Sequence, residues 1–201
     1  PLRVPTNTAT ALILLPHLLF TDRLIYRSEL KEEDGSLRFL RALRLDDSDE
    51  SVYPRAAEAG EWVVPGTFAF NFSEREPTHL DGGERSAFRH GFLGLTSFGW
   101  STLAVVVEMP TTEQRQVLER LAHHFVDQYG APDMAAAMTE ARQEFEFCES
   151  LCTPDINTVL SLQRDFVDGE IREAFRVHRP KSEWESAPVF RMEPDEEGPA
   201  Q

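Results

Sequence analysis

The stretch that decides the fold is FRHGFLGLTSFGWST, residues 88–102, which is rich in glycine and aromatic residues. Its three glycines are Gly91, Gly94 and Gly99. A very apolar segment, Trp100–Met109, follows at once. Glycine suits positions where φ is positive or where two backbone segments approach closely. The stretch therefore predicts a short helix that ends at Gly91, then a turn, then a central strand.

These glycines also have a functional interpretation, in which backbone N–H groups of the loop bind an anion or a cofactor. The candidate ligand-binding residues are then Arg89, His90, Gly91, Gly94, Gly99 and Trp100. Neither G-x-G-x-x-G nor G-x-x-x-x-G-K-[ST] is present, and no strand-loop-helix order surrounds the glycines. We therefore favour a role in shape, with Gly94 or Gly99 at a bulge or tight bend. His90 is expected to interact with the carbonyls at the end of the helix over Glu84–His90.

A β-hairpin is predicted near the end of the chain, with Asp168-Gly169 as a two-residue type I′ turn. This turn fixes the strand register, and the resulting cross-strand pairs are Phe166 with Ile171, Leu162 with Phe175, Leu160 with Val177, Arg164 with Glu173, and Asp165 with Arg172. Apolar residues meet apolar residues and acids meet bases. A slip of one residue would break all of these pairs.

The remaining elements complete an α+β pattern. Strands are expected over Ser36–Asp46, over Trp62–Phe72, where Phe68, Phe70 and Phe72 alternate, over Phe92–Leu95 and over Trp100–Met109. Two helices are expected, from Thr111, with Gln114 in capping-box spacing, to Gly130, and from Pro132 to about Cys152. We therefore expect an antiparallel sheet of about five strands with the two consecutive helices packed on one face.

The chain divides into three parts. Residues 1–35 form an N-terminal extension, residues 36–180 the α+β domain, and residues 181–201 an acidic C-terminal tail. Both extensions carry apolar residues that need burial, and such arms often become ordered on a partner.

Composition limits the partners. The 201 residues include 35 Asp and Glu against 20 Lys and Arg, which gives a formal net charge of −15. This charge repels the phosphates of nucleic acids and anionic membrane surfaces. The apolar residues Thr8–Phe20 are too few to span a bilayer. We expect no nucleic-acid partner and no membrane insertion, whereas a basic partner protein is compatible with the charge.

The two cysteines, Cys148 and Cys152, have a metal-binding interpretation. They are four residues apart on a predicted helix, so both thiols face one side, and His123 and His124 lie on the preceding helix. Both cysteines also continue an apolar stripe, which favours packing in the core. We therefore expect no metal and no cofactor. Two cysteines do not make a disulfide framework, which favours the cytoplasm.

Several segments resemble a small bacterial family of unknown function. They are residues 91–102, residues 37–45 with 55–63, and residues 168–176. The resemblance extends from about residue 37 to residue 180 and brings no catalytic residues with it. The family lies beside molybdenum-dependent formate dehydrogenase and its accessory factors, so the resemblance implies a helper role in that system.

The sequence thus predicts a non-catalytic accessory or protein-interaction protein. It would bind a protein partner, or a second copy of itself, through residues 1–35 and the acidic tail. One alternative is a small-molecule or metal-binding module that uses a pocket near His90–Trp100. Another is an enzyme of unrecognised type.

Overall fold

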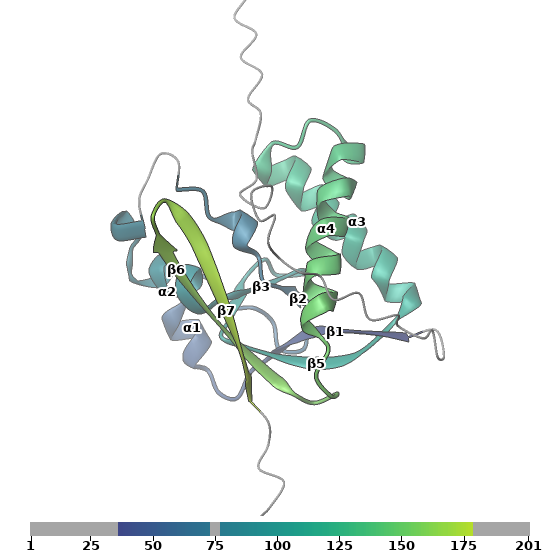
Figure 1. Ribbon diagram of the computed structural model, residues 1–201, viewed down its shortest axis with the longest axis horizontal. Helices are drawn as coiled ribbons and strands as arrows, with labels where there is room; N and C mark the ends of the chain where they lie inside the picture. The colour runs from purple at the N-terminus through teal and green to yellow at the C-terminus, as the bar shows by residue number, and fades with distance from the viewer. Residues whose placement is uncertain (1–35, 73–76, 179–201) are drawn as a thin grey trace, which may run out of the picture.

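The computed structural model describes residues 36–72 and 77–178 (Figure 1). The strands are β1 (Ser36–Leu43), β2 (Val63–Val64), β3 (Phe92–Gly94), β4 (Trp100–Ser101), β5 (Leu103–Pro110), β6 (Val159–Val167) and β7 (Glu170–His178). The α-helices are α1 (Ser48–Val52), α2 (Gly82–His90), α3 (Thr111–Tyr129) and α4 (Met134–Leu151), and short 3₁₀ helices cover Thr67–Ala69 and Pro77–His79. The predictions for residues 1–35 and 181–201 lie outside the described residues.

The strands form two antiparallel sheets, so the expected single sheet of about five strands is wrong. One sheet has the order β1-β5-β6-β7 and the other β2-β3-β4. The expected strand Trp100–Met109 divides at Thr102 and contributes to both sheets. The buried carboxylate of Asp49 accepts the Thr102 hydroxyl at 2.6 Å and the Thr102 N–H at 3.3 Å. A side chain therefore takes the hydrogen bond that a continuous strand would offer to its neighbour.

The hairpin of β6 and β7 has the register that the sequence predicts. The paired residues include Phe166 with Ile171, Leu162 with Phe175, Leu160 with Val177, Arg164 with Glu173, and Asp165 with Arg172. Asp168 and Gly169 have φ angles of 56° and 83°. Two positive φ angles are what a type I′ turn requires, so local turn chemistry sets this register.

The expected strand through Phe68, Phe70 and Phe72 is wrong. Gly66 has a φ of 71°, and the chain then enters the 3₁₀ helix over Thr67–Ala69. Phe68 is buried, whereas Phe70 and Phe72 are half-buried, contact each other and share Phe88 as a neighbour. Phe68 meets Phe125 edge-on at 4.7 Å, Phe70 stacks on Trp100 at 5.1 Å, and Phe72 meets Phe88 edge-on at 4.9 Å. The alternation of phenylalanines in this part of the sequence therefore reflects packing of their rings against several elements, and not one covered face of a strand.

The two long helices lie side by side and pack against both sheets (Figure 1). Helix α4 contacts β1 and β2, and α3 contacts β5, so the helices lie over the junction of the sheets. The N-cap of α3 is Pro110, without a side-chain cap, and Thr111 is already helical, so the predicted capping box is wrong. Gly130 ends α3 with a φ of 67°, as expected. Asp133 caps α4 by accepting the Ala136 N–H at 2.8 Å.

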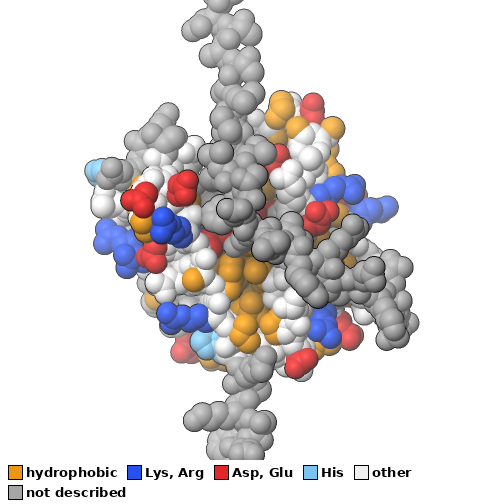
Figure 2. All heavy atoms as spheres, viewed as in Figure 1, with side chains coloured by type: hydrophobic (Ala, Val, Ile, Leu, Met, Phe, Trp, Pro, Cys, Tyr) orange, Lys and Arg blue, Asp and Glu red, His pale blue; other side chains and the backbone are white. Residues whose placement is uncertain are grey.

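One face of the molecule carries a mixed surface. Figure 2 shows acidic and basic side chains interspersed around its rim and hydrophobic atoms near its centre. No large area of a single charge is visible among the described atoms of this face.

The core contains a completely buried arginine, Arg164 of β6. Its Nε donates to Thr67 Oγ1 and to Glu173 Oε1, both at 2.9 Å. Its terminal nitrogens donate to the backbone carbonyls of Phe88, Gly91 and Pro65. One side chain thus joins β6 to β7, to the end of α2 and to the turn at residues 65–67. The sequence predicts the pairing with Glu173 but not the burial.

A buried carboxyl group lies on the helical side of the same turn. Glu144 of α4 accepts the Gly66 N–H at 3.0 Å. Burial is the main cause that raises the pKa of Glu144 to about 7, and Glu173 adds to the effect, whereas the Gly66 hydrogen bond and Arg164 oppose it. Ionisation of Glu144 in the folded protein is therefore costly.

Replacement of Glu144 by Gln is expected to make stability less dependent on pH. The pKa of Glu144 in the folded protein lies above its ordinary value of 4.5. The wild-type protein therefore loses stability as the pH rises from 4.5 to about 7. At pH 8 the free energy of unfolding of Glu144→Gln should exceed that of the wild type by up to about 3 kcal/mol. This difference should vanish near pH 4. Urea denaturation at the two pH values measures this. The exposed Glu146→Gln on the same helix is the control, and an equal shift in both variants would contradict the prediction.

Candidate binding pocket

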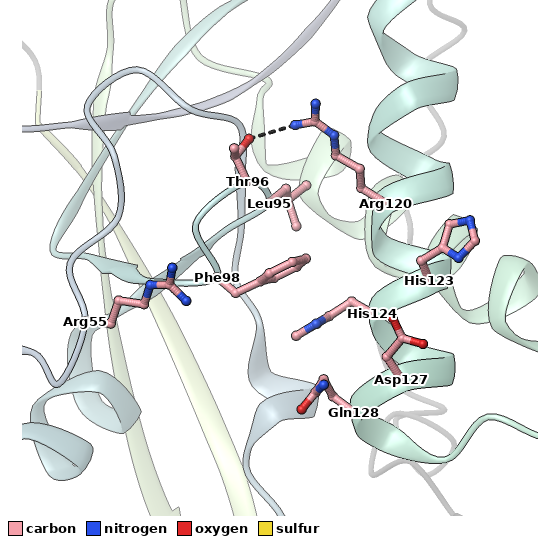
Figure 3. Close-up of a pocket in the computed structure, with 9 residues that line it drawn as sticks. All are labelled: Arg55, Leu95, Thr96, Phe98, Arg120, His123, His124, Asp127 and Gln128. Atoms are coloured by element: carbon pink, nitrogen blue, oxygen red, sulfur yellow. Dashed lines mark hydrogen bonds between the residues drawn. The ribbon is translucent and has the colours of Figure 1, made fainter.

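A pocket of about 590 Å³ lies between the loop at residues 95–98 and one side of α3 (Figure 3). It is lined by Arg55, Leu95, Thr96, Phe98, Arg120, His123, His124, Asp127 and Gln128. Figure 3 shows Phe98 and Arg55 on one side, and Arg120, His123, His124 and Asp127 along the helix on the other. The volume is in the range of small-ligand pockets.

The loop is held in place by a buried carboxylate, that of Glu61. It accepts the backbone N–H groups of Glu58 at 2.6 Å, Thr96 at 2.6 Å and Ser97 at 2.9 Å, and also the Ser97 hydroxyl. The Gly94 N–H donates to the Gly99 carbonyl at 2.8 Å and closes the loop. Hydrogen bonds to a charged acceptor are stronger than those between neutral groups. The pocket wall is therefore fixed before any ligand arrives.

The tip of this loop carries an unusual backbone conformation at Phe98, which has a φ of 52°. Positive φ is rare and strained for a bulky residue other than glycine. The Phe98 ring stacks on the ring of His124, with centroids 3.7 Å apart and planes 9° from parallel. His124 in turn meets Tyr129 edge-on at 5.3 Å. Aromatic stacking offsets part of the strain and creates a firm wall.

The pocket gathers positive charge in an acidic protein. Arg55 and Arg120 bring two guanidinium groups, against one carboxylate from Asp127. Arg120 Nη1 donates to Thr96 Oγ1 at 2.8 Å. In the part of the chain that the structure describes, neither arginine forms an ion pair. Burial lowers the pKa of His124, which favours the neutral imidazole, and the nearby Asp127 opposes this shift. The pocket suits a group of negative charge.

A second hollow of about 220 Å³ adjoins the first. It is lined by Arg41, Gly60, Glu61, Trp62, Thr96, Glu113, Gln116, Val117 and Arg120. The Arg41 guanidinium lies 3.9 Å from the centre of the Trp62 ring, a cation–π contact. Trp62 Nε1 donates to Glu113 Oε2 at 2.7 Å, and Arg41 lies 3.6 Å from the same oxygen. These contacts fix the Trp62 ring in the wall of this second hollow.

The glycines of residues 88–102 lie at close approaches of the chain. A Cβ on Gly91 would overlap the Trp100 ring, one on Gly94 the Glu61 carboxylate, and one on Gly99 the backbone of Ala56. Gly91 also ends α2. These three positions leave no room for a side chain, so the glycines have a steric role.

The other candidates from this stretch lie outside the pocket lining. Trp100 is half-buried and stacks on Phe70, and Arg89 is exposed. His90 is exposed, and its Nδ1 lies 3.3 Å from the carbonyl oxygen of Leu162, a residue of β6. The structure thus brings His90 to a neighbouring strand, whereas the sequence places it at the carbonyls of its own helix.

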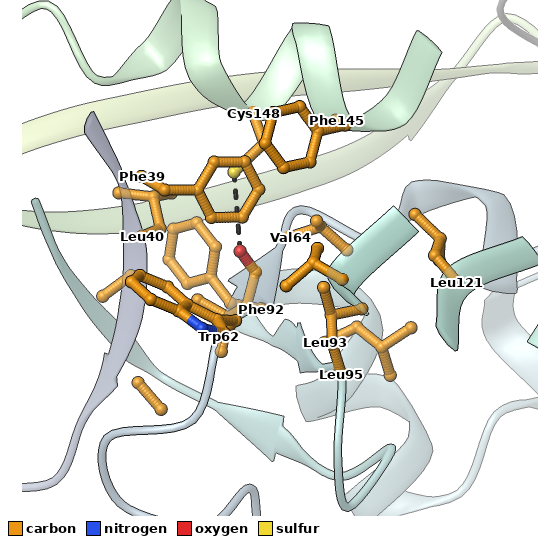
Figure 4. Packing of buried hydrophobic residues seen from close by; sticks show 14 of the residues in the cluster. Phe39, Leu40, Trp62, Val64, Phe92, Leu93, Leu95, Leu121, Phe145 and Cys148 are labelled. Atoms are coloured by element: carbon orange, nitrogen blue, oxygen red, sulfur yellow. Dashed lines mark hydrogen bonds between the residues drawn. The ribbon is translucent and has the colours of Figure 1, made fainter. Parts of the chain in front are cut away.

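The cysteines and histidines proposed as metal ligands occupy different surroundings. Cys148 and Cys152 are free and buried on α4, where Cys148 Sγ donates to the Val63 carbonyl at 3.4 Å and Cys152 Sγ to the Cys148 carbonyl at 3.3 Å. Figure 4 shows Cys148 among aromatic and aliphatic core residues. His123 and His124 line the pocket instead. In the described ranges, no three His, Cys, Asp or Glu residues are arranged to hold a metal ion.

Sequence reasoning located part of the pocket, because its alternative of a pocket near His90–Trp100 covers the loop at residues 95–98. It missed Arg55 and Arg120, and it considered His123 and His124 only as metal ligands. One signal was available, because Arg120, His123, His124 and Asp127 recur at helical spacing and so share one side of α3. Nothing local predicts that Arg55 and Phe98 face this side.

The chain belongs to a family of unknown function, DUF6505, whose model matches residues 37–191. No curated protein and no solved structure shows a significant match to the chain. Among the residues that the structure places, no helix combines the length and apolar character needed to cross a membrane.

Replacement of Gly99 by Ala tests the close approach in the loop. The new Cβ would overlap backbone atoms of Ala56 and Ala57, which have little freedom to move. Gly99→Ala should therefore lower the free energy of unfolding by about 1–3 kcal/mol. Gly82→Ala is the matched control, because a Cβ there meets nothing within 4 Å. Thermal or urea denaturation compares the two, and equal stability of both variants would refute the steric explanation.

Proposed function

We propose that this protein is a non-catalytic accessory protein and that the pocket between residues 95–98 and α3 holds a group of its partner. The observation that carries the proposal is the pair Arg55 and Arg120, which form no ion pair among the described residues and face a preformed wall. Arginine is the side chain best suited to recognise carboxylate or phosphate groups. The two guanidinium groups support a binding function and not a chemical reaction.

We further propose that the partner belongs to a molybdenum-dependent formate dehydrogenase system. This part of the proposal rests on the resemblance of residues 37–45, 55–63, 91–102 and 168–176 described above. Residues 1–35 and the acidic tail would add contacts to the same partner, and the cytoplasm is the expected location.

A second candidate function is a small-molecule binding module. The volume of about 590 Å³ favours it, because drug-sized ligands occupy pockets of this size. The half-buried ring stack of Phe98 and His124 would hold a flat ligand. An accessory protein would retain a partner macromolecule through the pocket, whereas a small-molecule binding module would not.

Affinity capture with the full chain as bait tests the accessory role. The baits are wild type, the double variant Arg55→Ala/Arg120→Ala, and Arg115→Ala, whose side chain is 85% exposed on α3. Wild type and Arg115→Ala should retain the same partner after cross-linking and mass spectrometry. The double variant should retain at least about tenfold less of this partner, because each lost guanidinium removes a charge-assisted contact.

Two results would contradict the proposal. One is equal recovery by all three baits, which would place the interaction elsewhere on the chain. The other is recovery of no specific partner. If a partner is recovered that has no connection to formate dehydrogenase, the accessory role stands and the assignment to that system fails. Circular dichroism of each bait controls for unfolding.

A further inference from the structure

Strand β7 forms an edge of the larger sheet. In the order β1-β5-β6-β7, it has β6 as its single neighbour among the strands that the structure describes. The strand has 9 residues and pairs with β6 without a bulge or a proline. Proteins usually shorten, bulge, charge or cover such an edge, because its unpaired backbone groups readily pair with another strand. The long and regular edge therefore makes β7 a surface for strand pairing.

The hairpin turn determines which backbone groups of β7 point away from β6. The pair that flanks the two-residue turn, Val167 and Glu170, is hydrogen-bonded, and hydrogen-bonded pairs then alternate with pairs that are not. The residues of β7 in the second kind of pair direct their N–H and C=O groups outward, and they are Ile171, Glu173, Phe175 and Val177. Within the described ranges, no backbone hydrogen bond joins these residues to a segment beyond the hairpin.

The same edge exposes apolar side chains. Val177 is 46% exposed, and Ile171 and Phe175 are half-buried. Two of their neighbours across the hairpin, Leu160 and Leu162, are buried. The inner face of the sheet is therefore less well covered at β7 than at β6, and a further strand beside β7 would cover these side chains.

The sequence of β7 complements a second copy of itself. Two antiparallel copies related by an axis through Glu173 place Glu170 of each copy opposite Arg176 of the other. The same register places Ile171 opposite Phe175 at two symmetric positions. Opposite charges and apolar pairs directly across a sheet stabilise strand pairing. All of these pairs occur twice in the dimer, so their contributions are doubled.

Like charges disfavour the neighbouring registers. An axis through Arg172 places that arginine opposite itself, and an axis through Ala174 places Arg172 opposite Arg176. In the favoured register Glu173 meets its own copy, but each carboxylate already pairs with the buried Arg164 of its own chain at 2.9 Å. The charge of Glu173 is therefore balanced before the two strands meet.

We propose that the edge of β7 pairs with β7 of a second copy of this chain, with the two strands antiparallel about an axis through Glu173. The two four-stranded sheets then form one continuous sheet across the dimer. No residue of β7 lines the pocket beside α3. This interface therefore goes beyond the proposed function and does not depend on it.

Sedimentation equilibrium of the full-length protein tests the dimer. At about 0.1 mM the wild type should have twice the chain mass of 22.9 kDa. Arg176→Glu and Glu170→Arg should each weaken the dimer at least about tenfold, because each places like charges opposite each other at both symmetric positions. The double variant Glu170→Arg/Arg176→Glu restores opposite charges and should dimerise as the wild type does. Arg115→Glu, at a side chain of α3 that is 85% exposed, is the control.

Disulfide trapping tests the register. In the proposed dimer Arg172 lies opposite Ala174 of the other copy in a pair without hydrogen bonds, whose Cα atoms are about 4.5 Å apart. This separation permits a disulfide. Arg172→Cys and Ala174→Cys, mixed with different tags, should therefore form a mixed disulfide when diamide oxidises the thiols. Arg172→Cys mixed with the exposed Glu146→Cys of α4 is the control, and the native cysteines are buried.

Several results would overturn the inference. One is a monomeric wild type at about 0.1 mM. Equal dimerisation of the wild type and both single charge variants would place the interface on another surface, such as residues 1–35 or the acidic tail. Failure of the double variant to recover, or trapping no faster than in the control mixture, would reject the register. A persistent dimer that captures no partner would reject the accessory function and leave this interface standing.

Discussion

The structure depends on the buried guanidinium of Arg164. Its N–H groups make five hydrogen bonds, to a hydroxyl, a carboxylate and three backbone carbonyls, and those acceptors come from three separate segments of the chain. A buried charge is tolerated when it is paired and fully hydrogen-bonded, and removal of one partner costs about 3–5 kcal/mol. Glu173 supplies the pairing charge from the adjacent strand. The end of α2, the 65–67 turn and the final hairpin are therefore locked into one arrangement.

A second polar cluster, around Glu61, holds the loop of the pocket in one conformation. The Glu61 carboxylate holds the Thr96 and Ser97 N–H groups on the protein side of the loop, so the side chains at the tip face α3. The strained Phe98 backbone persists because the surroundings determine it on both sides. A site that is rigid before binding loses less conformational entropy when the ligand arrives. Glu61 thus connects the protein interior to the loop that forms the proposed recognition site.

The elements that sequence reasoning located well are those with a local cause. Asp168 and Gly169 allow the two positive φ angles of the hairpin turn, and Gly130 allows the positive φ that ends α3. The elements that it misplaced depend on distant partners. Thr102 divides an apolar strand because Asp49, far away in sequence, takes its hydrogen bonds. Phe68 and its aromatic neighbours alternate because they are buried against several elements, which imitates the period of a strand.

By itself, the sequence determined the hairpin register, the two long helices and the end of α2 at Gly91. Each of these follows from backbone preferences and side-chain periodicity within a few turns of chain. The tertiary structure decided that Arg164 is buried, that the strands separate into two sheets, and that Arg55 and Phe98 face the side of α3 that carries Arg120 and His124. The physical reason is that burial and pocket geometry arise from atoms many residues apart, and a local pattern does not record which distant segment fills the space beside it.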